Sequence, residues 1–363
     1  MKFEVKTSEL NNAIRIASRG VSKVSGNNLL DGILFSTENG NITLYSTDLR
    51  INIKTVLECN VIEEGKFILN ANLISEVARK MQGENCMVDI NNNLCTIKSE
   101  RSTLKFACSP ADEFPKFPTL EENGRLTISG EDFINMVSKS RVSVSLDENR
   151  LIYTGIKFES KDGFIEASSL DGYRISITKK KTDYNNGNIS FIVPSQTLYD
   201  VEKLIKEDEE LLIRLTDSHA MISFSNTEIY TRLFEGDFFD YNSLVSTDGT
   251  TEVIVNKKDL SDALDRAMIV SKGNVNMVRL DIKDNNMNIR SKGSLGETND
   301  DLEIEKSGEN LLIAFNPKYM RDGIAEFSED NIKMVFKSST DPLTIFGLKD
   351  IEYTYILLPV RLQ

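Results

Sequence analysis

The apolar positions of the chain repeat one helical pattern three times. The segments that begin at Lys6, Ser129 and Asn256 read KTSELNNAIRIAS, SGEDFINMVSKS and NKKDLSDALDRAM, and each follows a short alternating stretch typical of a strand. Their apolar residues recur at i, i+3, i+4 and i+7, which predicts a helix buried on one face. Ser129 and Asn256 stand where a helix N-cap belongs.

A second helical pattern also occurs three times. It reads FILNANLISEVARKM from Phe67, FIVPSQTLYDVEKLI from Phe191 and LIAFNPKYMRDGIAEF from Leu312. Phe67 and Phe191 lie 124 residues apart, and Phe191 and its counterpart Ile313 lie 122 apart, so the repeating unit has about 120 residues. We therefore expect helices over residues 8–23, 72–82, 129–142, 195–207, 256–272 and 316–326.

The stretches between and after these helices have the alternation of antiparallel strands. Asn39-Gly40 and Asp162-Gly163 supply the positive φ that a tight hairpin requires. In the first two units S-x-D, ending at Asp48 and Asp171, is followed by R-I-x-I. Each unit reads as two helices set against two antiparallel sheets, an α+β module. We expect three domains, at residues 1–123, 124–247 and 248–363.

The distribution of charge along the chain says more about function than the overall composition does. The 363 residues include 43 Lys and Arg against 56 Asp and Glu, a net charge of -13, which argues against a protein that coats nucleic acid with its whole surface. The six predicted helices carry 15 Lys and Arg against 12 Asp and Glu, or +3, which leaves 28 against 44, or -16, elsewhere. Helices gathered on one surface would attract phosphates locally, and the alternative is that these cations are simply solvated helix faces.

No residues are arranged for catalysis or for holding a metal or cofactor. His219 is the one histidine, which removes most imidazole-based metal sites and triads. Cys59, Cys86, Cys95 and Cys108 form no CxxC pair, and the start MKFEVKTSEL has no apolar core of a signal peptide. No apolar run reaches the length of a membrane helix. We expect a cytoplasmic protein with reduced thiols, without catalytic residues, metal, cofactor or membrane association.

Seven short segments, in order along the whole chain, resemble one family. They are MKFEV at Met1, FACSPADEFPKF at Phe106, SLDGYRI at Ser169, FEGDFFDY at Phe234, VRL at Val278, IAFNPKYMRDGI at Ile313 and the ending LLPVRLQ. Together they resemble the β subunit of bacterial DNA polymerase III, the sliding clamp. The resemblance implies the DNA clamp fold, a closed ring made by a head-to-tail homodimer, and a non-catalytic processivity factor of the polymerase III holoenzyme.

In such a ring the helices face double-stranded DNA, which is held without sequence preference. Long, flexible cations that reach phosphates suit that task. The residues expected to face DNA are Arg15, Arg19, Lys23, Arg79, Lys80, Lys139, Arg141, Lys203, Lys206, Arg266 and Lys272.

The resemblance also implies an apolar pocket that binds linear clamp-binding motifs of partner proteins. The expected partners are the polymerase III alpha subunit, the clamp loader, and other polymerases and repair proteins. The positions carried over are Tyr153, Leu170, Gly172, Tyr173, Arg174, Ile175, Phe239, Leu244, Thr340, Pro342, Ile356, Leu358, Pro359, Val360, Arg361 and Leu362. Leu170, Tyr173 and Phe239 depart from the usual residues of the family, as a diverged member would, so we expect weaker peptide binding.

The dimer interface is expected to join the first unit of one chain to the third unit of the other. Opposite charges would set its register, and apolar side chains would supply most of the affinity. Its expected residues are Arg101, Leu104, Lys105, Ile269, Val270, Glu297, Asp300, Asp301 and Glu303.

Two other classes of protein are the alternatives. A β-rich repeat scaffold or binding protein without DNA function would have no helices gathered around DNA. A carboxylate-based hydrolase would need a cleft with acids of raised pKa.

Overall fold

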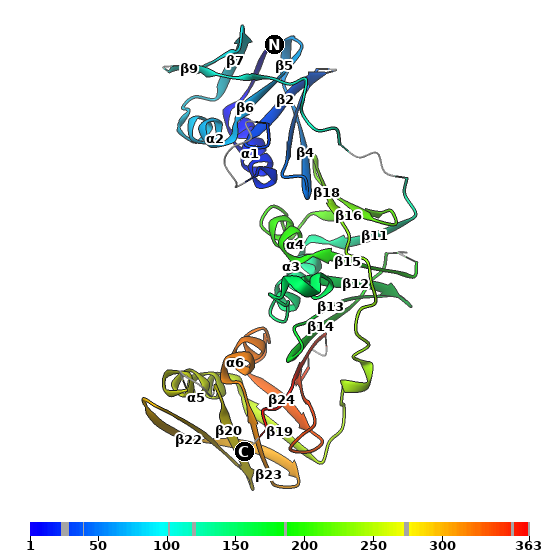
Figure 1. The fold of residues 1–363 in the computed structure, drawn as a ribbon, viewed down its shortest axis with the longest axis vertical. Helices are drawn as coiled ribbons and strands as arrows, with labels where there is room; N and C mark the ends of the chain where they lie inside the picture. Colours follow the sequence, from blue (N-terminus) through cyan, green and yellow to red (C-terminus); the bar gives the residue numbers. More distant parts are fainter. Residues whose placement is uncertain are drawn as a thin grey trace. The chain divides into compact units, whose positions relative to one another are not determined.

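The chain forms two compact units, each built from two separate stretches of sequence (Figure 1). Its structure is a computed structural model that describes residues 1–22, 29–38, 40–100, 102–117, 121–184, 187–271, 276–349 and 352–361. Unit 1 comprises Met1–Glu131 and Thr197–Leu233, and unit 2 comprises Asp132–Gln196 and Phe234–Gln363. The middle repeat is thus divided between the two units.

Unit 1 contains two antiparallel sheets. The five-stranded sheet has the order β5 (Asn60–Glu63), β1 (Lys2–Lys6), β7 (Asn85–Asn91), β8 (Leu94–Lys98), β9 (Thr103–Ala107). The nine-stranded sheet has the order β10 (Ser109–Pro110), β6 (Gly65–Asn70), β2 (Gly32–Glu38), β3 (Asn41–Thr47), β4 (Ile51–Glu58), β18 (Thr227–Arg232), β17 (His219–Phe224), β16 (Glu210–Leu215), β11 (Gly124–Ser129). Helices α1 (Thr7–Ala17) and α2 (Ala71–Lys80) pack side by side, and their apolar faces share one core with both sheets.

Unit 2 is organised around one long sheet. Its order is β15 (Ile189–Pro194), β12 (Gly155–Lys161), β13 (Phe164–Leu170), β14 (Arg174–Lys181), β26 (Tyr353–Leu357), β25 (Leu343–Gly347), β24 (Asn331–Phe336), β19 (Thr251–Asn256), β22 (Gly296–Gly308), β21 (Asn286–Gly293), β20 (Val278–Lys283), β23 (Leu311–Phe315). Helices α5 (Lys257–Val270) and α6 (Pro317–Ala325) pack together on it. Helices α3 (Gly130–Arg141) and α4 (Ser195–Glu202) each begin in one unit and end in the other.

The sheets of the repeats continue from one repeat into the next. In unit 1 β4 pairs with β18, which joins the first repeat to the second. In unit 2 β14 pairs with β26, which joins the second to the third. These two pairings, here called the β4·β18 junction and the β14·β26 junction, satisfy strand edges that each repeat would otherwise expose.

All six predicted helices are present, and their ends differ from the prediction in ways that have local causes. Asn256 caps α5 as predicted, with its side chain accepting from the backbone N–H of Lys258 and Asp259. Helix α1 ends at Ala17 rather than at residue 23, because a 3-10 turn, Ser18–Gly20, follows it. The Ser18 hydroxyl donates back to the Ile14 carbonyl at 2.6 Å. Asp162-Gly163 adopts the predicted positive φ, whereas Asn39 lies outside the described residues.

Candidate functional site

The two inter-repeat junctions begin at turns of the same design. Asp48 accepts hydrogen bonds from the backbone N–H of Arg50 and Ile51, both at 2.9 Å. Asp171 accepts the corresponding bonds from Tyr173 and Arg174, at 2.9 and 3.1 Å. Ile51 then pairs with Thr231 across the first junction, and Arg174 pairs with Leu357 across the second. Arg174 therefore occupies the strand position of Ile51.

This equivalence shows that the two R-I-x-I motifs do not occupy the same positions on their strands. One residue separates Asp48 from Arg50, but two separate Asp171 from Arg174, so the second motif is displaced by one position along its strand. Because side chains alternate with a period of two, a shift of one residue moves each of them to the other face. Ile53 lies against Gly20 beyond α1, whereas Ile175 and Ile177 join a separate cluster that contains no residue of an α-helix.

That separate cluster of packed side chains, called the apolar pocket here after the role predicted for it, contains five of the sixteen residues predicted to bind partners. Leu170, Ile175 and Ile356 are buried in it, and Tyr153 and Leu244 pack against it as expected. The prediction missed Ile177, Phe238, Tyr241 and Val245. The signal for Ile177 was its place two residues after Ile175 on one strand face.

Phe238, rather than the predicted Phe239, packs against the apolar pocket. The Phe238 ring meets the Tyr153 ring edge to face with centroids 5.8 Å apart, whereas Phe239 is exposed and does not belong to the cluster. The neighbouring Tyr241 is buried, and its hydroxyl donates to Glu166 at 2.5 Å. The FFDY segment therefore contributes two aromatic residues three positions apart, Phe238 and Tyr241, to the cluster.

Arg174 is held inside the protein and is not a free donor at the rim, contrary to the prediction. Its guanidinium donates to Asp171 at 2.9 Å and to Asp322 on α6 at 3.0 Å, and it lies 4.3 Å above the Tyr319 ring. Burial lowers the pKa of Arg174, but the nearby Tyr355 and the two carboxylates outweigh it, so the pKa is raised. Arg174 thus fixes one wall of the pocket against α6.

The chain beyond β26 is tied to unit 2 on both sides of Pro359. The Leu358 backbone N–H donates to the Tyr173 carbonyl at 2.9 Å, and that of Val360 donates to the Ala314 carbonyl at 2.8 Å. Leu358, Pro359 and Val360 are half-buried, Arg361 is exposed, and Leu362 lies outside the described residues. Thr340 is exposed, Pro342 half-buried, and the turn residues Gly172 and Tyr173 are exposed; none of the four belongs to the buried cluster.

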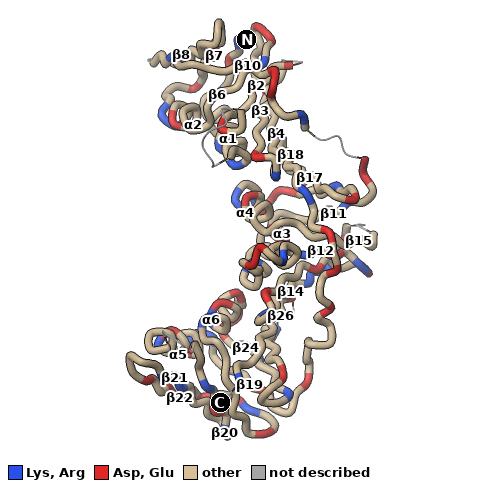
Figure 2. The backbone as a smooth tube through the Cα atoms, viewed as in Figure 1, with Lys and Arg blue, Asp and Glu red and all other residues tan. Residues whose placement is uncertain are grey.

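Most of the predicted DNA-facing cations are exposed and lie on helices or just after them. Figure 2 shows Lys and Arg in blue along the backbone, on helices as well as elsewhere. Arg79 and Lys80 end α2 and make no ion pair with any described residue. Other predicted cations are already engaged: Arg19 contacts Asp200 at 3.4 Å, Arg266 contacts Asp300 at 2.7 Å, and Lys203 lies near Glu202 and the Tyr199 ring. The exposed set also includes Arg15, Arg141 and Lys206, while Lys23 and Lys272 lie outside the described residues.

Lys139 does not fit the prediction, because its side chain is buried. The residue is only 8% exposed, and its ammonium lies 5.5 Å from the centroid of the Tyr353 ring. A buried ammonium over an aromatic face is held by the protein rather than offered to a phosphate. We therefore remove Lys139 from the set of candidate DNA-facing residues.

Two strand edges carry the residues predicted for the dimer interface. Strand β9 closes one edge of the five-stranded sheet, with Leu104 half-buried and Lys105 exposed, while Arg101 lies outside the described residues. The first half of β22 pairs with β21 alone among the described strands and carries Glu297, Asp300, Asp301 and Glu303. At the end of α5, Ile269 is 63% exposed and Val270 is half-buried.

The described residues contain no group of three or more His, Cys, Asp or Glu that could hold a metal ion. His219 opens β17, and its Nδ1 lies 2.9 Å from the Ser218 hydroxyl. Burial raises the pKa of the Cys95 thiol to about 12. Among the residues that the structure describes, no helix is both long and apolar enough to cross a bilayer.

Comparison with known proteins gives one family for the whole chain. Models of the DNA polymerase III beta subunit match its N-terminal domain at residues 1–118, its central domain at 127–240 and its C-terminal domain at 242–361. The beta sliding clamp of Bacillus subtilis is 26% identical over 376 residues, covering 99% of this chain and 100% of that protein.

Solved structures agree. The beta subunit from Thermotoga maritima is 27% identical with a TM-score of 0.92, and the sliding clamp from Bacillus subtilis is 25% identical with a TM-score of 0.94; each match covers 100% of both chains. The chain therefore belongs to the family of DNA polymerase III beta subunits, and has the three-domain DNA clamp fold and the function of a DNA sliding clamp.

Proposed function

We propose that two copies of the chain close head to tail into a ring around duplex DNA, and that the apolar pocket tethers polymerases and other replication and repair proteins by short peptides. The observation that carries the DNA part is the pair of exposed cations at the end of α2, Arg79 and Lys80, which make no ion pair with a described residue. Flexible cations without protein partners can reach phosphates through water and let the ring slide. The role needs no catalytic group.

The DNA part is tested by reversing charge at the end of α2. The double variant Arg79→Glu with Lys80→Glu should lose retention on nicked circular DNA while its melting point stays within about 2 °C, because exposed cations contribute little to folding. The matched control reverses Lys161 and Lys181, two exposed lysines at the ends of β12 and β14, for the same change in net charge. Equal retention by the two variants would contradict the proposal, as would retention of the unaltered protein on linearised DNA.

The peptide part rests on the apolar pocket and the tied segment after β26. The expected ligands carry a glutamine and spaced Leu or Phe side chains, which gain affinity by burying apolar area. The variant Leu358→Ser should weaken binding of such a fluorescent peptide about 10-fold, since about 1.4 kcal/mol of apolar burial is lost. Its backbone bond to Tyr173 remains, so folding should be preserved.

The matched control for the pocket is Leu312→Ser on β23, an exposed leucine of unit 2 that lies outside the cluster. That variant should bind the peptide as the unaltered protein does. If both variants bind equally, the pocket is not the peptide site. Phe239 stands where the family usually has proline, so the variant Phe239→Pro should bind the peptide more tightly.

The ring part rests on two strand edges of opposite charge. The exposed edge β9 carries Lys105, and the free half of β22 is acidic, so strand pairing between copies would bring opposite charges together. We expect a dimer by solution mass at micromolar concentration, and a monomer for Ile269→Asp. A dimeric Ile269→Asp variant would contradict this interface.

A further inference from the structure

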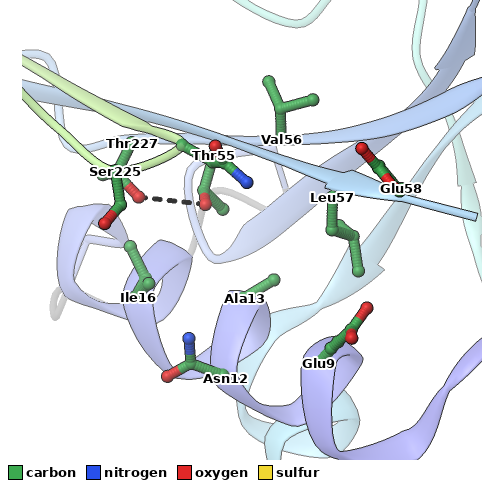
Figure 3. Close-up of a pocket in the computed structure, with 11 residues that line it drawn as sticks. Glu9, Asn12, Ala13, Ile16, Thr55, Val56, Leu57, Glu58, Ser225 and Thr227 are labelled. Atoms are coloured by element: carbon green, nitrogen blue, oxygen red, sulfur yellow. Dashed lines mark hydrogen bonds between the residues drawn. The ribbon is translucent and has the colours of Figure 1, made fainter.

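The β4·β18 junction borders a hollow in unit 1. The hollow has a volume of about 340 Å³ and opens between α1, the end of β4 and the turn from β17 to β18 (Figure 3). Ala13, Ile16 and Leu57 form apolar walls. At the back, the Thr227 hydroxyl donates to that of Thr55 at 3.0 Å, so these two polar groups satisfy each other.

The equivalent space in unit 2 is filled by the protein's own side chains. The sequence repeat places Met136 where α1 has Ala13, and the strand registers place Tyr353 where β18 has Thr227. Met136 is fully buried, and Tyr353 packs on Phe327 with ring centroids 4.7 Å apart. The hollow in unit 1 therefore corresponds to the space that an aromatic ring occupies in unit 2.

Basic groups accompany that ring in unit 2. Lys139 lies over Tyr353, and the Lys180 ammonium contacts Asp132 at 3.1 Å and Glu352 at 3.0 Å. Asp132 is the equivalent of Glu9, which lies at the mouth of the hollow in unit 1 with Glu58. Lys6 contacts Glu9 at 3.2 Å, whereas Glu58 is exposed and makes no ion pair with a described residue. Such an acidic mouth repels phosphates and attracts cations.

We propose that this hollow is a second docking site, which takes an aromatic side chain with a neighbouring lysine or arginine from a peptide segment of a partner protein. The ring enters between α1 and the junction, where Tyr353 and Met136 lie in unit 2, and the basic group remains at the mouth beside Glu58. The site is separate from the apolar pocket of unit 2, so one clamp can hold two partners by different chemistries.

The test follows the methyl signals of Ala13, Ile16 and Leu57 in the full-length protein by NMR while acetyl-Tyr-Lys-amide is added. We expect saturable shifts at these methyls, with a dissociation constant on the order of 1 mM for so small a probe. Acetyl-Ala-Lys-amide should give no saturable shift, because it lacks the ring. Acetyl-Tyr-Glu-amide should bind about 5-fold more weakly, because its charge is repelled at the mouth.

Two variants fill the hollow from opposite sides with the residues that unit 2 uses. Thr227→Tyr and Ala13→Met should each abolish the shifts, and either one is sufficient if the other does not fold. Glu58→Gln should weaken the lysine probe about 2- to 5-fold and leave the glutamate probe unweakened. The proposal is overturned if the lysine probe shifts none of the three methyls, if shifts persist in a folded filled variant, or if only Ile175 and Ile356 of the apolar pocket respond.

Discussion

The two junctions between repeats have the same strand pairing, but their apolar side chains lie on opposite faces of the sheet. In the β4·β18 junction, Ile53 and Leu57 face α1, and the far face carries Asn52 and Lys54. In the β14·β26 junction, Ser176 and Lys180 face α3, with Ile175 and Ile177 on the far face. One extra residue in a turn has turned the apolar side of a strand outward, and that outward side forms the apolar pocket.

The same displacement explains what each junction puts beneath its helix. The second junction places polar and charged groups there, and each has a partner: Ser176 meets Ser143 at 2.8 Å, and Lys180 meets Asp132. The first junction places apolar groups beneath α1 and leaves the hollow. An apolar cluster on one face of this junction therefore requires a satisfied polar layer on the other, since buried polar groups without partners are costly.

The largest expected effect comes from making the second junction resemble the first. Tyr353→Thr removes a ring that is almost fully buried, so the free energy of unfolding should fall by about 3–5 kcal/mol. Urea denaturation measures this. The counterpart Thr227→Ala removes only one hydroxyl bond and a methyl group, and should lower it by about 1 kcal/mol. Equal losses would contradict the inference that a ring fills at one junction the space that is open at the other.

The second prediction compares the contributions to stability of two arginines, each of which binds the aspartate of its own turn. Arg174 has a side chain only 11% exposed and contacts two carboxylates, so Arg174→Met should lower the free energy of unfolding by about 2–4 kcal/mol. Arg50 contacts Asp48 at 3.0 Å but is 90% exposed, so Arg50→Met should change it by less than about 0.5 kcal/mol. Chemical denaturation of both variants measures this difference. Similar losses in the free energy of unfolding would contradict the prediction.

The smallest effect concerns the ammonium beneath α3. Burial lowers the pKa of Lys180, but its bonds to Glu352 and Asp132 outweigh this and raise the pKa above its usual 10.5. A raised lysine pKa stabilises the fold below the unfolded pKa, and that contribution is lost as pH rises through the folded pKa. Lys180→Met should therefore cost about 0.5–1 kcal/mol at neutral pH and less above pH 10.5. A loss that stays constant across this range would show that the ion pairs contribute nothing.

Local patterns predicted the elements well, because helices and hairpins depend on neighbouring residues. The stripe Leu260, Ala263, Leu264 and Ala267 is buried in α5, and Asn256 caps it. Likewise, the positive φ of Asp162 and Gly163 follows from residues adjacent in sequence. The seven family segments extended this to the fold.

The parts that sequence missed depend on partners far away along the chain. Lys139 reads as a solvated helix cation until Tyr353, more than 200 residues later, is placed beneath it. Arg174 reads as a pocket donor until Asp322 binds it. The displacement of R-I-x-I was visible as a difference of one residue after Asp48 and Asp171, but only the strand pairing shows which face it exposes.

The division of the middle repeat between the two units has a consequence for synthesis on the ribosome. Strand β4 is complete at Glu58, but its partner β18 begins only at Thr227, so the emerging chain carries an unpaired edge through about 170 residues of elongation. An open edge of this kind invites pairing with other nascent chains, and chaperones would be needed to cover it. Nascent chains stalled before residue 227 should be cleaved by protease in the first repeat, and those extended past residue 233 with the ribosomal exit tunnel cleared should resist. The order in which this clamp matures is thus set by strand pairing and not by its threefold repeat.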